Sequence, residues 1–169
     1  MSSNEQAIVR KYSVGVEEGR DERSRAASLE FRYTLRHITP YIRKNSRVIE
    51  IGCGTGYYAL RLAPLCREYD GIDITPYNIE LMKEKIKSSG IANITARVGD
   101  ATHLKDIPDG AYDVVLCLGP MYHLPPEERK LAFAEAARIA APGAIVALSY
   151  INALGVYAGA CAIDGRYPN

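Results

Sequence analysis

Short apolar runs alternate with longer amphipathic stretches over most of the chain. The runs are rich in β-branched residues and are bounded by turn residues, which is the pattern of buried strands. The predicted strands cover residues 47–51, 68–74, 94–98, 112–118 and 144–150. The fourth run is apolar almost throughout, as expected for a strand that is covered on both faces of its sheet.

Helical periodicity fills the segments between these runs, because apolar positions recur there at steps of three and four. The predicted helices cover residues 21–37, 57–65, 76–89 and 126–140. Thr75-Pro76 predicts the start of one helix, with Thr75 as its N-cap. Pro142-Gly143 predicts the end of the last helix. Residues 1–19 show little periodicity, and we expect them to form a mobile arm.

Strands that alternate with helices pair in parallel through right-handed crossovers. We therefore predict an α/β fold with a doubly wound, parallel, Rossmann-like sheet of about five strands and an N-terminal helical extension. A chain of 169 residues fits one domain. We divide it into an N-terminal arm and helix at 1–45, a Rossmann-like body at 46–150 and a C-terminal segment at 151–169.

Composition and charge narrow the class of protein. Hydrophobic residues make up 47% of the chain and charged residues 24%, which is typical of a globular domain. A net charge of +1 gives no strong nucleic-acid footprint. The apolar runs are too short to cross a membrane, and the first residues lack the apolar stretch of a secretory signal. The four cysteines are widely spaced, form no metal-binding motif and fit a reducing, cytoplasmic location.

A glycine-rich segment, Glu50-Ile-Gly-Cys-Gly-Thr-Gly56, follows the first predicted strand. Glycines let the backbone turn sharply and let a ligand approach without a Cβ in the way. Such a segment can also be an ordinary strand-to-helix turn, but its position between a strand and a helix favours a ligand loop. In parallel sheets, ligands bind at the carboxyl ends of the strands, where the strand order reverses.

Two carboxylates follow the next two predicted strands. Asp73 lies 17 residues beyond Gly56, where an acid can accept hydrogen bonds from both hydroxyls of a ribose. The alternative is that Asp73 caps the next helix. Asp100 can accept a hydrogen bond from an adenine amino group, or it can be a plain turn residue. Together with the glycine-rich segment, these acids predict a nucleoside site.

Taken in this order, the glycine-rich segment and the two acids resemble the motifs of the class I S-adenosylmethionine-dependent methyltransferases. Residues 112–118 look like the fourth strand of that family, and Leu118-Gly-Pro-Met-Tyr-His-Leu124 resembles a segment of its small bacterial members. The resemblance makes 46–150 the cofactor-binding domain and implies S-adenosylmethionine as the cofactor. The residues that it assigns to the cofactor are Glu50, Gly52, Cys53, Gly54, Gly56, Asp73, Ile74, Asp100, Ala101 and Leu118.

A nicotinamide dinucleotide is an alternative ligand for such a fold. Its pyrophosphate needs bare backbone amides in a GxGxxG arrangement, whereas this chain has GxGxG followed by the bulky Tyr57 and Tyr58. Glu50 would repel a pyrophosphate but suits the ammonium group of a methionine moiety, directly or through water. We therefore favour a methyltransferase over an NAD(P)-dependent oxidoreductase.

Methyl transfer from a sulfonium is an in-line displacement, so the protein chiefly aligns the acceptor with the methyl carbon. Tyr122 and His123 follow the fourth strand and are the candidate catalytic residues. His123 titrates near neutrality and can deprotonate an oxygen or nitrogen acceptor, or it can simply pack in its loop. No Asn-Pro-Pro-Tyr-like segment is present, and Cys117 is read as core. A small-molecule acceptor is therefore favoured over RNA or protein.

The two ends of the chain lead to further expectations. Residues 1–45 are expected to close the pocket as a lid, or else to present a solvated helix face. Family members usually complete the sheet with two more strands, for which 151–169 is too short and too rich in glycine, so the C-terminal strands are expected to be missing. An open sheet edge with an apolar tail predicts a homodimer. The competing class is a non-catalytic protein that binds the cofactor or a partner.

Overall fold

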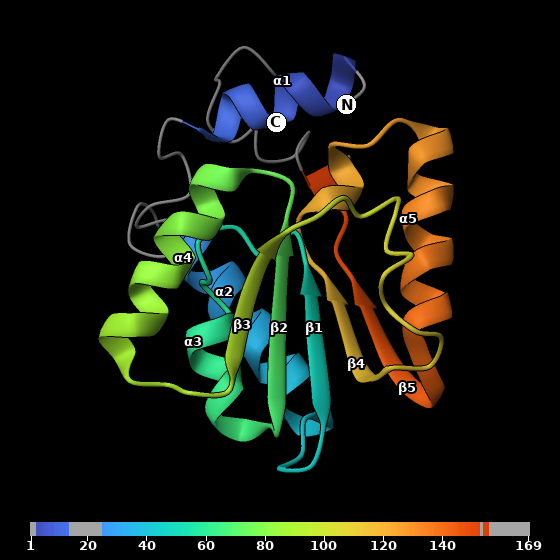
Figure 1. Cartoon of the computed structure of the whole chain (residues 1–169). Helices are drawn as coiled ribbons and strands as arrows, with labels where there is room; N and C mark the ends of the chain where they lie inside the picture. Colours follow the sequence, from blue (N-terminus) through green and yellow to red (C-terminus); the bar gives the residue numbers. More distant parts are fainter. Residues whose placement is uncertain (1–2, 14–24, 153, 156–169) are drawn as a thin grey trace, which may run out of the picture.

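The computed structural model describes residues 3–13, 25–152 and 154–155. In this part of the chain, five parallel strands form one sheet in the order β3-β2-β1-β4-β5 (Figure 1). The strands are β1 (Arg47–Ile51), β2 (Glu68–Asp73), β3 (Ile94–Val98), β4 (Tyr112–Cys117) and β5 (Ala140–Leu148). The predicted α/β class and the parallel, Rossmann-like sheet are confirmed. The strand order reverses between β1 and β4.

Helices connect the strands and cover both faces of the sheet. They are α1 (Ser3–Tyr12), α2 (Arg25–Ile38), α3 (Ala59–Leu62), α4 (Pro76–Ser89) and α5 (Pro126–Ile139). The predicted helix at 57–65 is divided into α3 and a 3₁₀ turn at Ala63–Leu65, which contains Pro64. Within the described ranges, no helix is long and apolar enough to cross a membrane.

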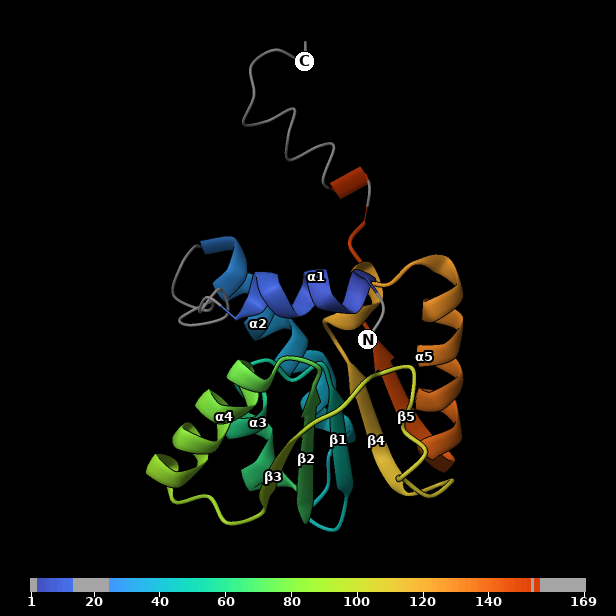
Figure 2. The same ribbon diagram turned by 45° about the horizontal axis from the view of Figure 1, so that its top comes forward.

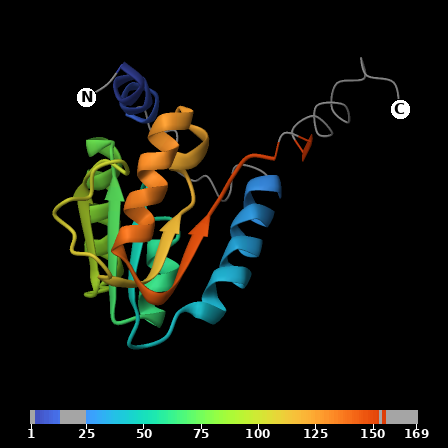
Figure 3. The ribbon, with the colours of Figure 1, turned by 90° about the vertical axis from the view of Figure 1, so that its right-hand side faces the viewer.

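The sheet is buried between two apolar clusters. Successive residues of a strand point to opposite faces, so the run in β1 supplies both clusters. Val48 packs in the cluster that α2, α3 and α4 cover, whereas Ile49 and Ile51 pack in the cluster beneath α5. Figure 3 shows α2 and α5 on opposite sides of the strands. This arrangement is the doubly wound form that the sequence predicts.

The expectation of a mobile arm at residues 1–19 is wrong for residues 3–12, which form α1. This helix lies across the carboxyl ends of the strands (Figures 1 and 2). It contacts α4 and the loop that follows β4, both far from it in the sequence. Asn4 of α1 donates hydrogen bonds to the carbonyl oxygen of His123 and to the Glu128 carboxylate.

A second expectation that is wrong concerns the junction between α5 and β5. The helix ends at Ile139 and the strand begins at once with Ala140, so Pro142 and Gly143 lie inside the strand. Proline is tolerated there because β5 is the edge strand of the described sheet. Gly143 has a φ of 82°, and the register with β4 is irregular near the start of β5.

Candidate active site

A cavity lies at the carboxyl ends of the strands, next to the point where the strand order reverses, and α1 lies above it (Figure 2). Its walls come from the segments that follow four successive strands, together with residues of α1, α2 and α5. The wall segments are residues 52–54, 73–75, 99–101 and 118–124. The fold therefore brings the predicted glycine-rich segment, both predicted acids and the segment after β4 to one site.

The glycine-rich segment turns sharply because three of its residues have positive φ angles. These angles are 76° at Gly52, 54° at Gly54 and 82° at Gly56. A Cβ on Gly52 would lie 2.4 Å from the ring of Pro120, and a Cβ on Gly56 would lie 2.8 Å from the Met82 side chain. Glycine is thus required at these two positions by packing as well as by backbone conformation.

Asp73 performs two tasks at the end of β2. One carboxylate oxygen accepts a hydrogen bond from the Gly54 amide at 2.9 Å, and the other accepts from the Thr75 amide at 2.8 Å and from Asn78 Nδ2 at 3.2 Å. Burial raises its pKa, and these hydrogen bonds oppose that shift. Asp73 thus holds the turn that leads into α4 and also lies in the cavity wall, but the N-cap position of this helix belongs to Thr75. Thr75 occupies the N-cap position of α4, but its side chain makes no capping hydrogen bond.

Glu50 is the most deeply buried acid of the cavity, with only 2% of its surface exposed. The hydroxyl of Tyr69 donates to its carboxylate at 2.7 Å. Burial raises the pKa of Glu50 to about 8; the Tyr69 hydrogen bond lowers it and the charge of Asp73 raises it. A carboxyl with this pKa is mostly protonated at neutral pH unless a cation enters the cavity.

Three buried polar atoms of the described residues have no hydrogen-bond partner: Tyr57 Oη, Thr75 Oγ1 and Asn78 Oδ1. All three residues line the cavity. An unsatisfied buried polar atom costs about 1–3 kcal/mol, so native structures rarely contain three at one place. A ligand with several hydroxyl and amino groups fits this arrangement, as a nucleoside-containing cofactor does.

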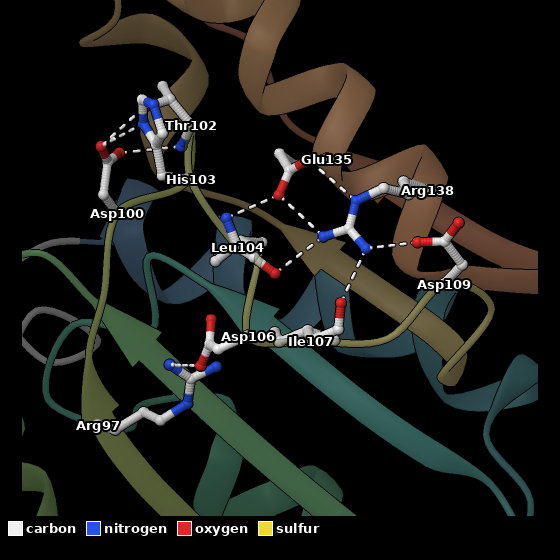
Figure 4. A network of polar contacts seen from close by, with 10 residues as sticks. All are labelled: Arg97, Asp100, Thr102, His103, Leu104, Asp106, Ile107, Asp109, Glu135 and Arg138. Atoms are coloured by element: carbon white, nitrogen blue, oxygen red, sulfur yellow. Dashed lines mark hydrogen bonds and ion pairs between the residues drawn. The ribbon is translucent and has the colours of Figure 1, made fainter.

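Asp100 begins the loop between β3 and β4. Its carboxylate accepts hydrogen bonds from the Thr102 amide at 2.9 Å and from the Thr102 hydroxyl at 2.7 Å, and His103 Nδ1 lies 3.3 Å away (Figure 4). The turn reading of Asp100 is therefore correct, and the residue also faces the cavity beside Gly99 and Ala101.

Figure 4 shows a polar clamp, formed by Glu135 and Arg138, that fastens this loop to α5. Glu135 accepts a hydrogen bond from the Leu104 amide at 2.7 Å. Arg138 donates to the carbonyl oxygens of Leu104 and Ile107, each at 2.8 Å, and pairs with Asp109 at 2.7 Å. The hydrogen bond from Arg138 lowers the pKa of Glu135. The sequence analysis missed this clamp because it depends on how α5 packs against the loop.

At the other end of the cavity, α1 meets the segment after β4. The Tyr12 hydroxyl and His123 Nε2 lie 2.6 Å apart, and the two rings meet edge to face. Tyr122 stacks beside His123 with ring centroids 4.4 Å apart. Both candidate catalytic residues therefore line the cavity, and α1 holds one of them directly.

The predicted cofactor residues lie in the cavity wall with a single exception. Gly56 lies behind the wall, against Met82, and its role there is to allow close packing. Wall residues without a sequence signal are Glu5, Ile8, Glu30, Asn78 and Glu128. Arg20, just before the predicted helix at 21–37, and Arg23, in its first turn, lie outside the described residues.

The fold and the cavity define a class: a Rossmann-like domain whose strand ends carry a cavity lined by glycine-rich backbone, buried acids and tyrosines. Residues 48–143 match the family model described as a methyltransferase domain. The chain therefore belongs to that family, among the class I S-adenosylmethionine-dependent methyltransferases, as the resemblance in its motifs indicates.

Individual relatives agree with this assignment. The chain is 28% identical over 128 residues to the uncharacterized methyltransferase YcgJ of Bacillus subtilis, covering 76% of this chain and 49% of that protein. It is 32% identical over 116 residues to ajmaline N-methyltransferase of Rauvolfia serpentina, covering 65% and 38%. The crystal structure of YcgJ superposes with a TM-score of 0.64 at 26% identity, covering 69% of this chain and 50% of that chain. The chain thus spans half or less of the length of these relatives.

Proposed function

We propose that the protein transfers the methyl group of S-adenosylmethionine to a small-molecule acceptor. The observation that carries the proposal is the set of unsatisfied buried atoms between the acids of the cavity. Glu50 would take the ammonium group of the cofactor, Asp73 its ribose hydroxyls, and Asp100 with Ala101 its adenine. When bound, the cofactor supplies a methyl group that is already activated by the positive sulfur.

The contribution of the chain to the reaction is alignment and the exclusion of water. Gly52 lets the backbone approach the cofactor closely. The packed ring of Pro120 fixes the start of the segment after β4, at residues 118–124. His123, oriented by Tyr12, is available to take a proton from an oxygen or nitrogen acceptor. Tyr122 would form part of the acceptor wall.

We also propose that residues 1–45 act as a lid. The contacts of α1 support this role, because Asn4 and Tyr12 both bind the segment that carries His123. Opening α1 would break these hydrogen bonds and expose the cavity to solvent. Protection of residues 1–40 from proteolysis on addition of cofactor would support the lid, and unchanged cleavage would contradict it.

The charge of the wall favours a neutral or basic acceptor. Six acidic residues and neither lysine nor arginine occur among the described lining residues. An acceptor that carries a phosphate or a carboxylate would be repelled by this surface, whereas an amine would be attracted. Four tyrosines of the wall, at positions 12, 57, 58 and 122, can pack against an aromatic or cationic acceptor.

A methyl-transfer assay with tritiated S-adenosylmethionine tests the proposed function. The panel should contain amines, phenols and carboxylic acids of similar size, and binding of the cofactor should be compared with that of NAD(P)H by calorimetry. We expect labelled product from an amine or phenol and binding of the cofactor alone. Cofactor binding without transfer to any acceptor would favour a non-catalytic binding protein, and tight dinucleotide binding would contradict the proposal.

Two further parts of the proposal concern the protein in its cell. We propose a cytoplasmic location, which the widely spaced cysteines support, and a homodimer that covers the edge strand β5, where Ile145 is exposed. Light scattering at high concentration tests the dimer. A clean monomer would refute it.

A further inference from the structure

Glu50 and Tyr69 form a buried acid–phenol pair whose position follows from the register of the sheet. Glu50 of β1 lies opposite Gly71 of β2, so its neighbours on the same face of β2 are residues 69 and 73. The Tyr69 hydroxyl reaches the carboxylate at 2.7 Å, while the Met82 and Cys53 side chains pack against Gly71. Asp73 lies on the other side of Glu50, toward the cavity. The acid thus sits between a hydrogen-bond donor and a second acid.

Among the described residues, no cation is found among the groups that shift the pKa of Glu50. Titratable groups face it from both neighbouring strands, from the glycine-rich segment and from the residue before α3: Tyr69, Asp73, Cys117, Cys53 and Tyr58. Each of these is an acid or is neutral when protonated. A positive group stabilises a buried carboxylate, and the ammonium group of a ligand would supply that charge.

We infer that Tyr69 is a positioning residue for the cofactor, whose hydroxyl holds the Glu50 carboxyl to receive the ammonium group, and that cofactor binding expels a proton from Glu50 into solvent. The inference rests on the proposed function. Only the O–H bond of the carboxyl breaks in this step, because the ammonium group keeps its three protons. Tyr69 itself stays protonated, since burial and the charge of Glu50 both raise its pKa.

The sign of the pH dependence follows from the pKa of about 8 for Glu50 in the empty cavity. Below this pH the acid has to lose a proton when the ammonium group binds, so affinity rises with pH by up to about tenfold per unit. Above about pH 8, Glu50 is already mostly ionised in the empty cavity, so the affinity no longer rises with pH for this reason. Replacing Tyr69 with Phe removes a hydrogen bond that favours the ionised acid. The loss is therefore largest at neutral pH and shrinks as the pH rises.

Calorimetry with two ligands separates the inference from the proposed function. S-adenosylhomocysteine carries the ammonium group, and 5′-methylthioadenosine shares the nucleoside but lacks the amino-acid end. We expect Tyr69→Phe to weaken binding of S-adenosylhomocysteine about tenfold at pH 7 and less at pH 9, while binding of methylthioadenosine stays the same. The ratio of variant to wild type at each pH cancels the titration of the ligand itself.

Tyr112→Phe is the matched control. Tyr112 is also a buried strand tyrosine, and its hydroxyl donates to a carboxylate, that of Asp70, at 2.7 Å. Neither Tyr112 nor Asp70 lines the cavity. This variant should lose a comparable hydrogen bond and bind both ligands as the wild type does.

The proton count of the wild-type protein gives an independent readout. Titrations at pH 7 in two buffers of different ionisation enthalpy should show release of about one proton with S-adenosylhomocysteine and none with methylthioadenosine. Absence of release would overturn the inference, as would an equal loss of both ligands at every pH in Tyr69→Phe. If the Tyr69→Phe variant does not fold, the number of protons released by the wild-type protein decides whether the inference holds. Failure of both ligands to bind would instead overturn the proposed function.

Discussion

Glu50 carries opposite consequences for stability and for binding. In the unfolded chain its pKa is close to 4.5, and in the folded chain it is about 8, so the folded state holds a proton that the unfolded state has lost at neutral pH. Stability from this residue is therefore greatest below pH 4.5 and decreases as the pH rises toward 8, by about 1.4 kcal/mol per unit. The residue that destabilises the empty protein is the one that a cationic ligand needs.

Glu50→Gln should separate these two effects. The amide accepts the Tyr69 hydrogen bond without ionising, so we expect the midpoint of thermal unfolding at pH 7 to rise by about 3–8 °C. Affinity for S-adenosylhomocysteine should fall at least about tenfold, because no negative charge meets the ammonium group. Differential scanning calorimetry and titration calorimetry measure the two effects.

Glu80→Gln on α4 is the control for Glu50→Gln, because Glu80 is exposed and pairs with Lys83 on the surface. It should change neither quantity measurably. A Glu50→Gln protein that is less stable than the wild type at pH 7 would show that the carboxyl is not the destabilising group.

Single residues could be predicted where the chemistry follows from position along a strand. Asp73 and Asp100 were found because an acid just after a strand has to lie at the carboxyl edge of a parallel sheet. Tyr69 and Asn78 could not be found in the same way. The contact of Tyr69 with Glu50 depends on the register between β1 and β2. The contact of Asn78 with Asp73 depends on the direction of α4 after its N-cap.

At the scale of elements, the clamp on α5 determines the shape of the loop between β3 and β4. Arg138→Met removes its hydrogen bonds to Leu104 and Ile107 while keeping much of the side-chain volume. We expect affinity for S-adenosylhomocysteine to fall about three- to tenfold, because the loop that presents Asp100 loosens. Hydrogen exchange of residues 100–110 should become faster in the same variant.

Lys130→Met on the same helix is the control for this prediction, since Lys130 makes only an exposed ion pair with Glu127. It should leave both affinity and exchange unchanged. Unaltered exchange of the loop in Arg138→Met would show that apolar packing, and not the clamp, holds the loop.

Tyr12→Phe tests the attachment of α1 to the site. The variant keeps the ring contact with His123 and lacks the hydroxyl that forms the hydrogen bond with it. Amide exchange of residues 3–12 should become several-fold faster, and KM for the acceptor should rise more than affinity for the cofactor falls. Tyr33→Phe on the exposed face of α2 provides the comparison, and a change of equal size there would contradict a specific role for Tyr12.

The bounds of strands and helices were predicted well where packing in the core determines the pattern of apolar residues. The bounds of β1 and β3 match the sequence prediction residue for residue, because their apolar runs end at clear turn residues. The start of β5 and the helix α1 were missed. Both lie at the margin of the core, where an edge strand accepts proline and where a short helix is held by polar contacts with a distant loop.

For the whole molecule, ligand binding should stabilise the fold in proportion to affinity. S-adenosylhomocysteine at 100 times its Kd adds about 2.7 kcal/mol, which corresponds to about 5–11 °C in the midpoint of thermal unfolding. NADH at equal concentration should give no shift, because Glu50 faces the place where a pyrophosphate would lie. A thermal scan with each ligand measures this, and an equal shift with NADH would contradict the site as assigned.

The topology of the whole sheet was predictable because crossover handedness leaves few choices once strands and helices alternate. A lid formed by residues 1–45 was expected from the sequence, but the contacts of α1 were not, because they join residues far apart in the sequence. Asn4 and Glu128, which join α1 to α5, are separated by most of the described chain. Periodicity reports the face that an element buries, but not the partner that it meets.

The close contact of Gly52 with Pro120 has a consequence for how this protein can change over evolutionary time. The two residues join the glycine-rich segment to the segment after β4, and no room remains between them for an added methyl group. Gly52 cannot gain a side chain while Pro120 keeps its place, so this contact constrains the spacing between the two segments. New acceptor preferences are therefore open to exchange of neighbouring side chains such as Tyr122, while the spacing that transfer requires is retained.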